Sequence, residues 1–146
     1  MRAQCANHDI TEVPSEFDLI SVDVYAGYKP GTQGIDEVAA AKKMYDIIFP
    51  KLHGHQKVML VPGTFACSNL TYFPLDDQAK NLVDKLDGYF EWAKSDDRIA
   101  GFNPWHFNNR SSPQAGGACD MELGAVAMPS VYAKLQEIGK FILGNS

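Results

Sequence analysis

Three short apolar runs, each followed by a helical pattern, constrain the fold of this chain more than any other feature. The runs span residues 17–25, 57–65 and 98–105, are rich in β-branched or aromatic residues, and are bounded by turn formers. Each run therefore predicts a strand. The middle run has almost no apolar–polar alternation in its core, which is typical of a parallel strand buried on both faces.

Helical periodicity follows each of these runs. The predicted helices span residues 35–49, 76–94 and 129–143. Their apolar residues recur at the i, i+3, i+4, i+7 spacing of a one-sided stripe. Asp76 is a candidate N-cap for the second helix, because its carboxylate can accept from free backbone N–H groups. Pro129 suits the first turn of the last helix, and Gly144 suits its C-terminal cap.

The predicted order is therefore β-α-β-α-β-α, which indicates an α/β fold with parallel strands and right-handed crossovers. Asp23, Thr64 and Trp105, at or near the ends of the three runs, are spaced 41 residues apart, close to one βα unit of a (β/α)8 barrel. Residues 26–31, after the first run, contain no glycine-rich phosphate motif. The loops after the strands are also longer than the returns from helix to strand, which favours barrel geometry over a doubly wound sheet.

Three strands are too few to close an eight-stranded barrel. We therefore expect residues 1–146 to be a single domain that forms a partial (β/α)8 barrel, the C-terminal part of a longer TIM barrel. An isolated arc would leave two sheet edges and an apolar face open to water. The expected partner is the missing N-terminal half-barrel or a second copy of the chain. A small three-stranded α/β layer is the alternative for a complete protein.

Charge and segment composition exclude several classes of partner. The formal net charge is −5 and the basic residues are scattered, so nucleic-acid binding is not expected. No apolar stretch approaches the roughly 18 residues that span a bilayer, so no membrane partner is expected.

The start of the chain has no apolar signal-peptide core. Acceptor patterns for glycosylation at Asn69 and Asn109 leave secretion open. Cys5, Cys67 and Cys119 fit either free thiols or one disulfide, for which Cys67 and Cys119 are the candidates.

The carboxyl ends of the predicted strands carry the residues best suited to chemistry, as in other parallel α/β proteins. Asp23 lies inside an apolar run, where an unpaired carboxylate is rare, so it is either functional or holds a neighbouring loop. Trp105 offers a broad apolar face and one N–H donor, which suits a sugar ring; plugging the barrel mouth is the alternative. His106 is a candidate acid/base group or hydroxyl ligand, with a non-catalytic, hydrogen-bonded histidine as the alternative.

Polar residues near these strand ends complete the predicted site. The predicted substrate-binding residues are Tyr25, Asn103, Trp105, His106 and Asn108. His53 and His55 lie at a helix-to-strand return, at the opposite end from this site, so a solvated pair is favoured over a metal site. No metal site and no nucleotide, flavin or other cofactor is predicted.

Short motifs at the ends of the runs resemble the C-terminal part of glycoside-hydrolase-like TIM barrels. They are Asp23-Val24-Tyr25, Leu60-Val61-Pro62-Gly63 and Gly101-Phe102-Asn103-Pro104-Trp105-His106. Residues 124–139 resemble the last helix of such barrels. The resemblance implies a carbohydrate-active domain that acts on or binds oligosaccharides or glycosides, with Asp23 as a catalytic carboxylate.

Glycosidases usually need two carboxyl groups that flank the scissile bond. The second run contains no Glu, and Asp120 and Glu122 in the last long loop are expected to be solvated. The second carboxylate therefore either lies in the missing N-terminal half of the barrel or does not exist. A non-catalytic carbohydrate-binding or inactive barrel fragment is the alternative.

Overall fold

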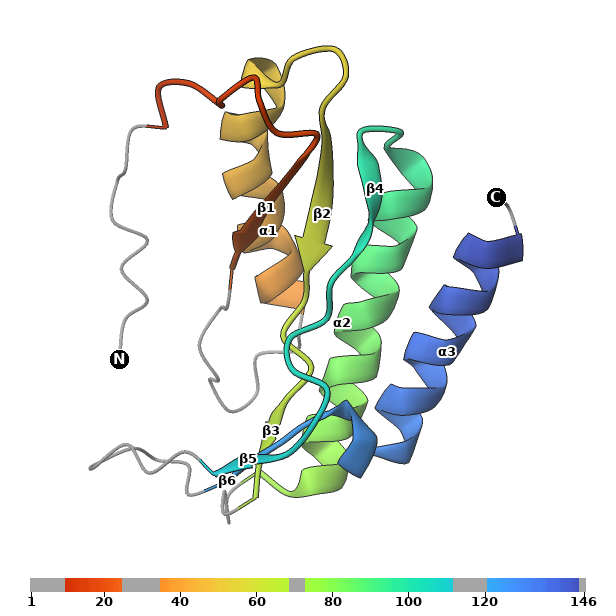
Figure 1. The fold of residues 1–146 in the computed structure, drawn as a ribbon. Coiled ribbons are helices and arrows are strands. Elements are labelled where there is room, and N and C mark those ends of the chain that lie inside the picture. Colours follow the sequence, from red (N-terminus) through yellow and green to blue (C-terminus); the bar gives the residue numbers. More distant parts are fainter. Residues whose placement is uncertain (1–9, 25–34, 69–72, 112–120, 145–146) are drawn as a thin grey trace.

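The computed structural model describes residues 10–24, 35–68, 73–111 and 121–144. The main elements, shown in Figure 1, are β1 (Leu19–Asp23), α1 (Ile35–Ile48), β2 (Lys57–Val61), α2 (Leu75–Ser95), β4 (Ile99–Phe102) and α3 (Pro129–Gly144). The short elements are two 3-10 helices, η1 (Phe49–Lys51) and η2 (Ala125–Ala127), and the strands β3 (Ala66–Cys67), β5 (Arg110–Ser111) and β6 (Met121–Leu123).

The three longer strands form one open sheet in the order β1-β2-β4, and both pairings are parallel. Val22 of β1 and Phe102 of β4 are both level with Leu60 of the central strand. The predicted α/β class and the β-α-β-α-β-α order are confirmed. The sheet is not closed in the part of the chain that the structure describes.

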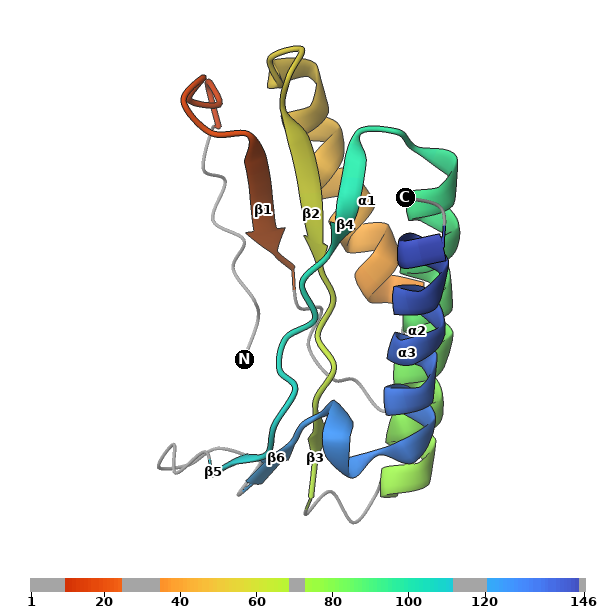
Figure 2. The same cartoon turned by 45° about the vertical axis from the view of Figure 1, so that its right-hand side comes forward.

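The helices α1, α2 and α3 lie on one side of this sheet. α1 and α2 cover the sheet, and α3 packs against α2 on the same side (Figure 2). Strands added in one direction through right-handed crossovers produce this arrangement. The expectation that β2 is buried on both faces is therefore wrong over most of its length. Val58 and Leu60, on the helix side, are fully buried, whereas Met59 on the other face is partly exposed.

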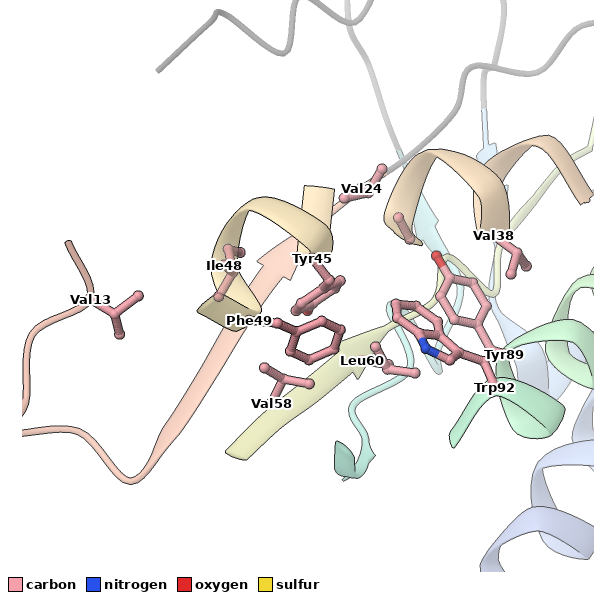
Figure 3. Packing of buried hydrophobic residues seen from close by; sticks show 11 residues of the cluster. Val13, Val24, Val38, Tyr45, Ile48, Phe49, Val58, Leu60, Tyr89 and Trp92 are labelled. Atoms are coloured by element: carbon pink, nitrogen blue, oxygen red, sulfur yellow. The ribbon is translucent and has the colours of Figure 1, made fainter. Parts of the chain in front are cut away.

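The core between sheet and helices is built around aromatic residues. Tyr45, Tyr89 and Trp92 are buried with Val58 and Leu60 of β2, as Figure 3 shows. The ring of Trp92 meets that of Tyr45 edge-on, with centroids 5.7 Å apart. Such a pair contributes about 0.5–1.5 kcal/mol beyond its buried area. The helix α2 therefore packs against the sheet through Tyr89 and Trp92.

A second cluster joins α2 to α3. It contains Leu82 and Leu86 of α2 with Val131 and Ile138 of α3, which are the residues of the predicted apolar stripes. Phe102 packs against both clusters and so connects the sheet to this helix pair. Among the described helices, none combines the length and the apolar character needed to cross a bilayer.

The start of α2 differs from the prediction. Pro74, not Asp76, occupies the N-cap position, and it makes no side-chain capping hydrogen bond. Asp76 lies in the first turn, where a carboxylate is favourably placed near the positive end of the helix. Buried Gln78 ties this turn to β3, because its amide accepts from the N–H of Cys67 at 2.8 Å and donates to the carbonyl of the same residue at 2.9 Å. At the far end of α3, Gly144, the predicted cap, is still part of the helix.

A small antiparallel sheet was not predicted. It has the order β3-β6-β5 and lies beyond the carboxyl ends of the parallel strands (Figure 1). Its strands are two or three residues long. Strands of that length carry no measurable alternation, so sequence periodicity cannot reveal them.

The hydroxyl of Tyr45 bridges the first two strands. It accepts from the N–H of Val22 at 3.0 Å and donates to the carbonyl of Met59 at 3.0 Å. The side chain therefore supplies a main-chain link between β1 and β2 from a helix that covers them. Burial raises the pKa of this hydroxyl, which keeps it protonated and able to donate.

Replacing Tyr45 with Phe leaves the core packing in place but removes this bridge. We expect the variant to be about 1–3 kcal/mol less stable, because two partly buried main-chain groups lose a partner. Urea denaturation measures the change. Tyr132→Phe, at an exposed position of α3, is the control and should shift stability by less than about 0.5 kcal/mol. Equal effects of the two substitutions would contradict the bridging role.

Candidate functional site

Three predicted site residues lie at the carboxyl edge of the parallel sheet. Asp23 is level with Val61, and the N–H of Asn103 donates to the carbonyl of Leu60 at 2.8 Å, which places Asn103 level with Val61 from the other side. Both side chains follow core-facing residues and so point to the face that no helix covers. Because neighbouring strands lie about 4.8 Å apart, the Cα atoms of Asp23 and Asn103 are about 10 Å apart.

Trp105 stands slightly beyond this pair, on the same edge. It forms a parallel bridge with Gly63: its N–H donates to the carbonyl of Pro62 at 2.9 Å, and its own carbonyl accepts from the N–H of Thr64. The peptide bond between Trp105 and His106 is cis. Trp105 is 47% exposed although its main chain is fixed. It therefore presents a rigidly anchored aromatic surface to solvent.

The chain after Trp105 is held from a second direction by the residues before α3. The N–H groups of Ala125 and Val126 donate to the carbonyls of His106 and Phe107, at 3.4 and 3.1 Å. Gly124 makes this approach possible, since a Cβ there would lie 2.4 Å from the carbonyl oxygen of Phe107. The loop that carries Trp105 is thus clamped between the end of β2 and the start of η2.

His106 points away from the exposed edge. Its ring stacks on Phe65 at 5.4 Å between centroids and with 9° between planes, and only 12% of the side chain is exposed. Within the described residues, neither ring nitrogen has a hydrogen-bond partner. Its Nδ1 is 3.8 Å from the carboxylate of Glu122, whose side chain is 24% exposed. The expectation that Glu122 is solvated is therefore wrong.

The sequence places Glu122 in a long loop, because the surroundings that partly bury it come from strand pairing. It lies on β6 and is level with Cys67 of β3 and Arg110 of β5. The run Met121-Glu122-Leu123 alternates apolar and polar residues, but a three-residue run is too short to indicate a strand. Asp120, the other acidic residue of that loop, lies outside the described residues.

The remaining predicted residues are dispersed. Asn108 is exposed, and its carbonyl oxygen lies close to Gly124. Tyr25 lies outside the described residues. The structure therefore brings Asp23, Asn103 and Trp105 to one edge and turns His106 toward the small antiparallel sheet.

A buried ion pair lies behind this edge. Nζ of Lys85 on α2 is 3.1 Å from Oε2 of Glu37 on α1, and the two side chains are 7% and 8% exposed. Oε1 of Glu37 accepts from the N–H of Gly63 at 3.3 Å and from the hydroxyl of Tyr89 at 3.5 Å. The sequence contains one indication of this pair. Glu37 and Lys85 are charged residues at helix positions that belong to the apolar stripes of α1 and α2, where charged side chains are expected to be buried.

Burial shifts both members of the pair toward their neutral forms. Desolvation raises the pKa of Glu37, an effect that Lys85 and the N–H of Gly63 partly offset. Desolvation also lowers the pKa of Lys85, against the attraction of Glu37. Two charges removed from water in this way stabilise a fold little, and breaking the pair by removing one partner is strongly destabilising.

The histidines of the first helix-to-strand return lie at the opposite end of the sheet. Nε2 of His53 is 3.2 Å from the carbonyl oxygen of Val13, and Nε2 of His55 is 3.1 Å from that of Ser15. Both rings thus contact main chain near the start of the described region. Among the described residues, no group of three or more His, Cys, Asp or Glu side chains is placed to hold a metal ion.

Cys67 is disulfide-bonded. Cys5 and Cys119 lie outside the described residues, so the predicted pairing of Cys67 with Cys119 stays a prediction. Cys67 belongs to β3, in the antiparallel sheet that also contains Glu122.

Comparisons with known proteins identify no relative of this chain. No protein-family model matches it, and neither a search of curated proteins nor a search of solved structures found a match. The geometry of the site therefore carries the functional argument.

Gly124→Ala tests the clamp on the Trp105 loop. The added Cβ would meet two backbone carbonyl oxygens that cannot move without breaking the clamp. We expect a loss of about 1–3 kcal/mol in the free energy of unfolding, measured in urea. Gly139→Ala is the matched control: nothing lies within 4 Å of its Cβ, and Ala in a helix should stabilise by about 0.5–1 kcal/mol. A stable Gly124→Ala variant would refute the close approach.

The buried pair predicts a pH dependence with a definite sign. A raised pKa in the folded state means that Glu37 contributes most below the ordinary carboxyl range and loses that contribution as the pH rises through the raised pKa. The double variant Glu37→Gln/Lys85→Met lacks this carboxyl group and therefore does not lose stability through its ionisation. Its stability relative to the parent should therefore increase as the pH rises through the acidic range in which Glu37 loses its proton. Urea denaturation at each pH measures this difference, and a difference that is constant with pH would contradict the assignment.

Proposed function

We propose that this chain is the last three βα units of a carbohydrate-active, glycoside-hydrolase-like (β/α)8 barrel. Parallel strands added in one direction, with α1, α2 and α3 on one side of them, are the arrangement of a barrel wall. The uncovered face then corresponds to the barrel interior, and half-exposed Leu19 lies on it. The two edge strands, β1 and β4, correspond to the points where the wall would continue.

The remaining βα units of that barrel are the proposed partner of this face. They would pair with the main chains of β1 and β4 and cover the apolar residues between them. A second copy of the chain is the alternative occupant. The disulfide at Cys67 supports a secreted protein, because disulfides persist in oxidising compartments.

The ligand proposed for the carboxyl edge is an oligosaccharide or glycoside. One observation carries this proposal: half-exposed Trp105 is held by main-chain bonds on the edge that also presents Asn103 and Asp23. An aromatic face packs against the C–H groups of a sugar ring, while amide and carboxylate groups bind its hydroxyls. Exposed Asn108, farther along the same loop, is proposed to extend the polar rim.

Hydrolysis would require a second carboxyl group about 5–9.5 Å from Asp23. Glu37 is buried against Lys85, and Glu122 lies beside His106, level with Cys67 and well past the end of β2. Asp23 is therefore proposed as one carboxylate of a pair whose other member belongs to the rest of the barrel. Carbohydrate binding without hydrolysis is the alternative, and the engagement of Glu37 and Glu122 favours it for this chain on its own.

Trp105→Ala tests the proposal. We expect affinity for the oligosaccharide that binds best, from a panel of gluco-, xylo-, manno- and chito-oligosaccharides, to fall at least about tenfold by titration calorimetry. Phe17→Ala is the control, because Phe17 is also about half-exposed but lies at the amino end of the sheet. Binding by Trp105→Ala that equals the parent, or no binding by the parent to any member of the panel, would overturn the proposal.

A further inference from the structure

The main chain of β2 continues past the point where β1 ends. β1 stops at Asp23, which is level with Val61, whereas β2 carries on to bridge Trp105 through Gly63. In that bridge the carbonyl of Pro62 and the N–H of Thr64 face Trp105. Successive residues of a strand direct their main-chain N–H and C=O groups to opposite sides, so the N–H of Gly63 points away from Trp105, toward the side on which β1 lies. The described part of β1 offers this N–H no acceptor.

Glu37 supplies that partner. Gly63 is buried, and its N–H donates to Oε1 of Glu37 at 3.3 Å. A buried N–H without an acceptor is destabilising, so the carboxylate takes the place of the missing strand carbonyl. Lys85 compensates the charge of Glu37 through Oε2, and the hydroxyl of Tyr89 donates to Oε1. Every polar atom of the Glu37 carboxylate is therefore engaged.

The hydrogen bond from Gly63 to Glu37 lies next to the main-chain hydrogen bonds that hold Trp105. Gly63 stands between Pro62 and Thr64, the two residues whose main chains bond Trp105 on either side. Fixing the orientation of Gly63 from one side therefore fixes the pair of hydrogen bonds on the other. A pair that served only to join α1 and α2 would not need the contact with Gly63, and apolar side chains would join two helices as well or better.

We propose that Glu37, neutralised by Lys85, is a positioning residue that completes the main chain of β2 and thereby holds Trp105 at the carboxyl edge. The value of that position for sugar binding rests on the proposed function. The positioning itself can be measured without any sugar.

The experiment compares two double variants that differ in one group. Glu37→Gln/Lys85→Met removes both charges but keeps an amide oxygen that can accept from Gly63. Glu37→Leu/Lys85→Met removes the acceptor as well. Native-state amide hydrogen exchange is followed by NMR at Gly63 and Trp105. The amide of Val58, which donates to the carbonyl of Arg98 at 2.8 Å at the amino end of the same pairing, is the internal reference.

We expect exchange at Gly63 and Trp105 to be at least about tenfold faster in the Leu/Met variant than in the Gln/Met variant, with Val58 unchanged. Unchanged exchange at Trp105 would overturn the proposal, even if Gly63 exchanges faster. An equal acceleration at Val58 would also overturn it, because the pair would then serve general stability alone. If the Leu/Met variant does not fold, Glu37→Asp replaces it: the shorter side chain keeps its charge but loses reach to Gly63, so the same pattern is expected.

Sugar titration of the two double variants keeps the two proposals apart. The positioning role is supported if the Glu37→Leu/Lys85→Met variant binds sugar more weakly than the parent while the Glu37→Gln/Lys85→Met variant binds it like the parent. If Trp105→Ala binds sugar like the parent while the exchange pattern holds, the proposed function fails and the positioning stands. If the exchange pattern fails while Trp105→Ala loses binding, only the positioning fails.

Discussion

The parallel pairing of β2 with a strand on each side is the interaction on which the rest of this structure depends. It fixes β1 and β4 in one register, and that register places Asp23, Asn103 and Trp105 at the same edge. The apolar side chains of β2 make this central position stable, because Val58 and Leu60 are fully buried beneath α1 and α2. A shift of one residue would turn them toward the uncovered face.

Buried polar side chains complete the main chain where the regular elements end. Tyr45 bridges β1 and β2, Glu37 receives the N–H of Gly63, and Gln78 pairs with both main-chain groups of Cys67. Gln56 does the same at the amino end, where its amide donates to the carbonyls of Pro14 and Phe17. An open three-stranded sheet has many unsatisfied backbone groups for its size, and these side chains satisfy them individually. The exposed aromatic ring of Trp105 can then rest on a rigid base.

The sequence predicts the parts of this fold that repeat a pattern over many residues. The three strands, their parallel order and the helix stripes that pack against them follow from periodicity and spacing. What depends on contacts between distant segments was missed. Glu122 is shielded by pairing with β3 and β5, and the acceptor role of Glu37 arises because β1 ends two residues before the Gly63 bridge. Closure of the sheet into a barrel and binding of a sugar remain predictions.

Hydrogen-bond scalar couplings, measured by NMR on the isotope-labelled chain, test the central claim most directly. The parallel arrangement predicts couplings from the N–H of Asn103 to the carbonyl of Leu60 and from the N–H of Trp105 to the carbonyl of Pro62. It also predicts a coupling from the N–H of Lys57 to the carbonyl of Asp18 on the β1 side. Short cross-strand Hα–Hα contacts between these segments, the mark of antiparallel pairing, would contradict the account.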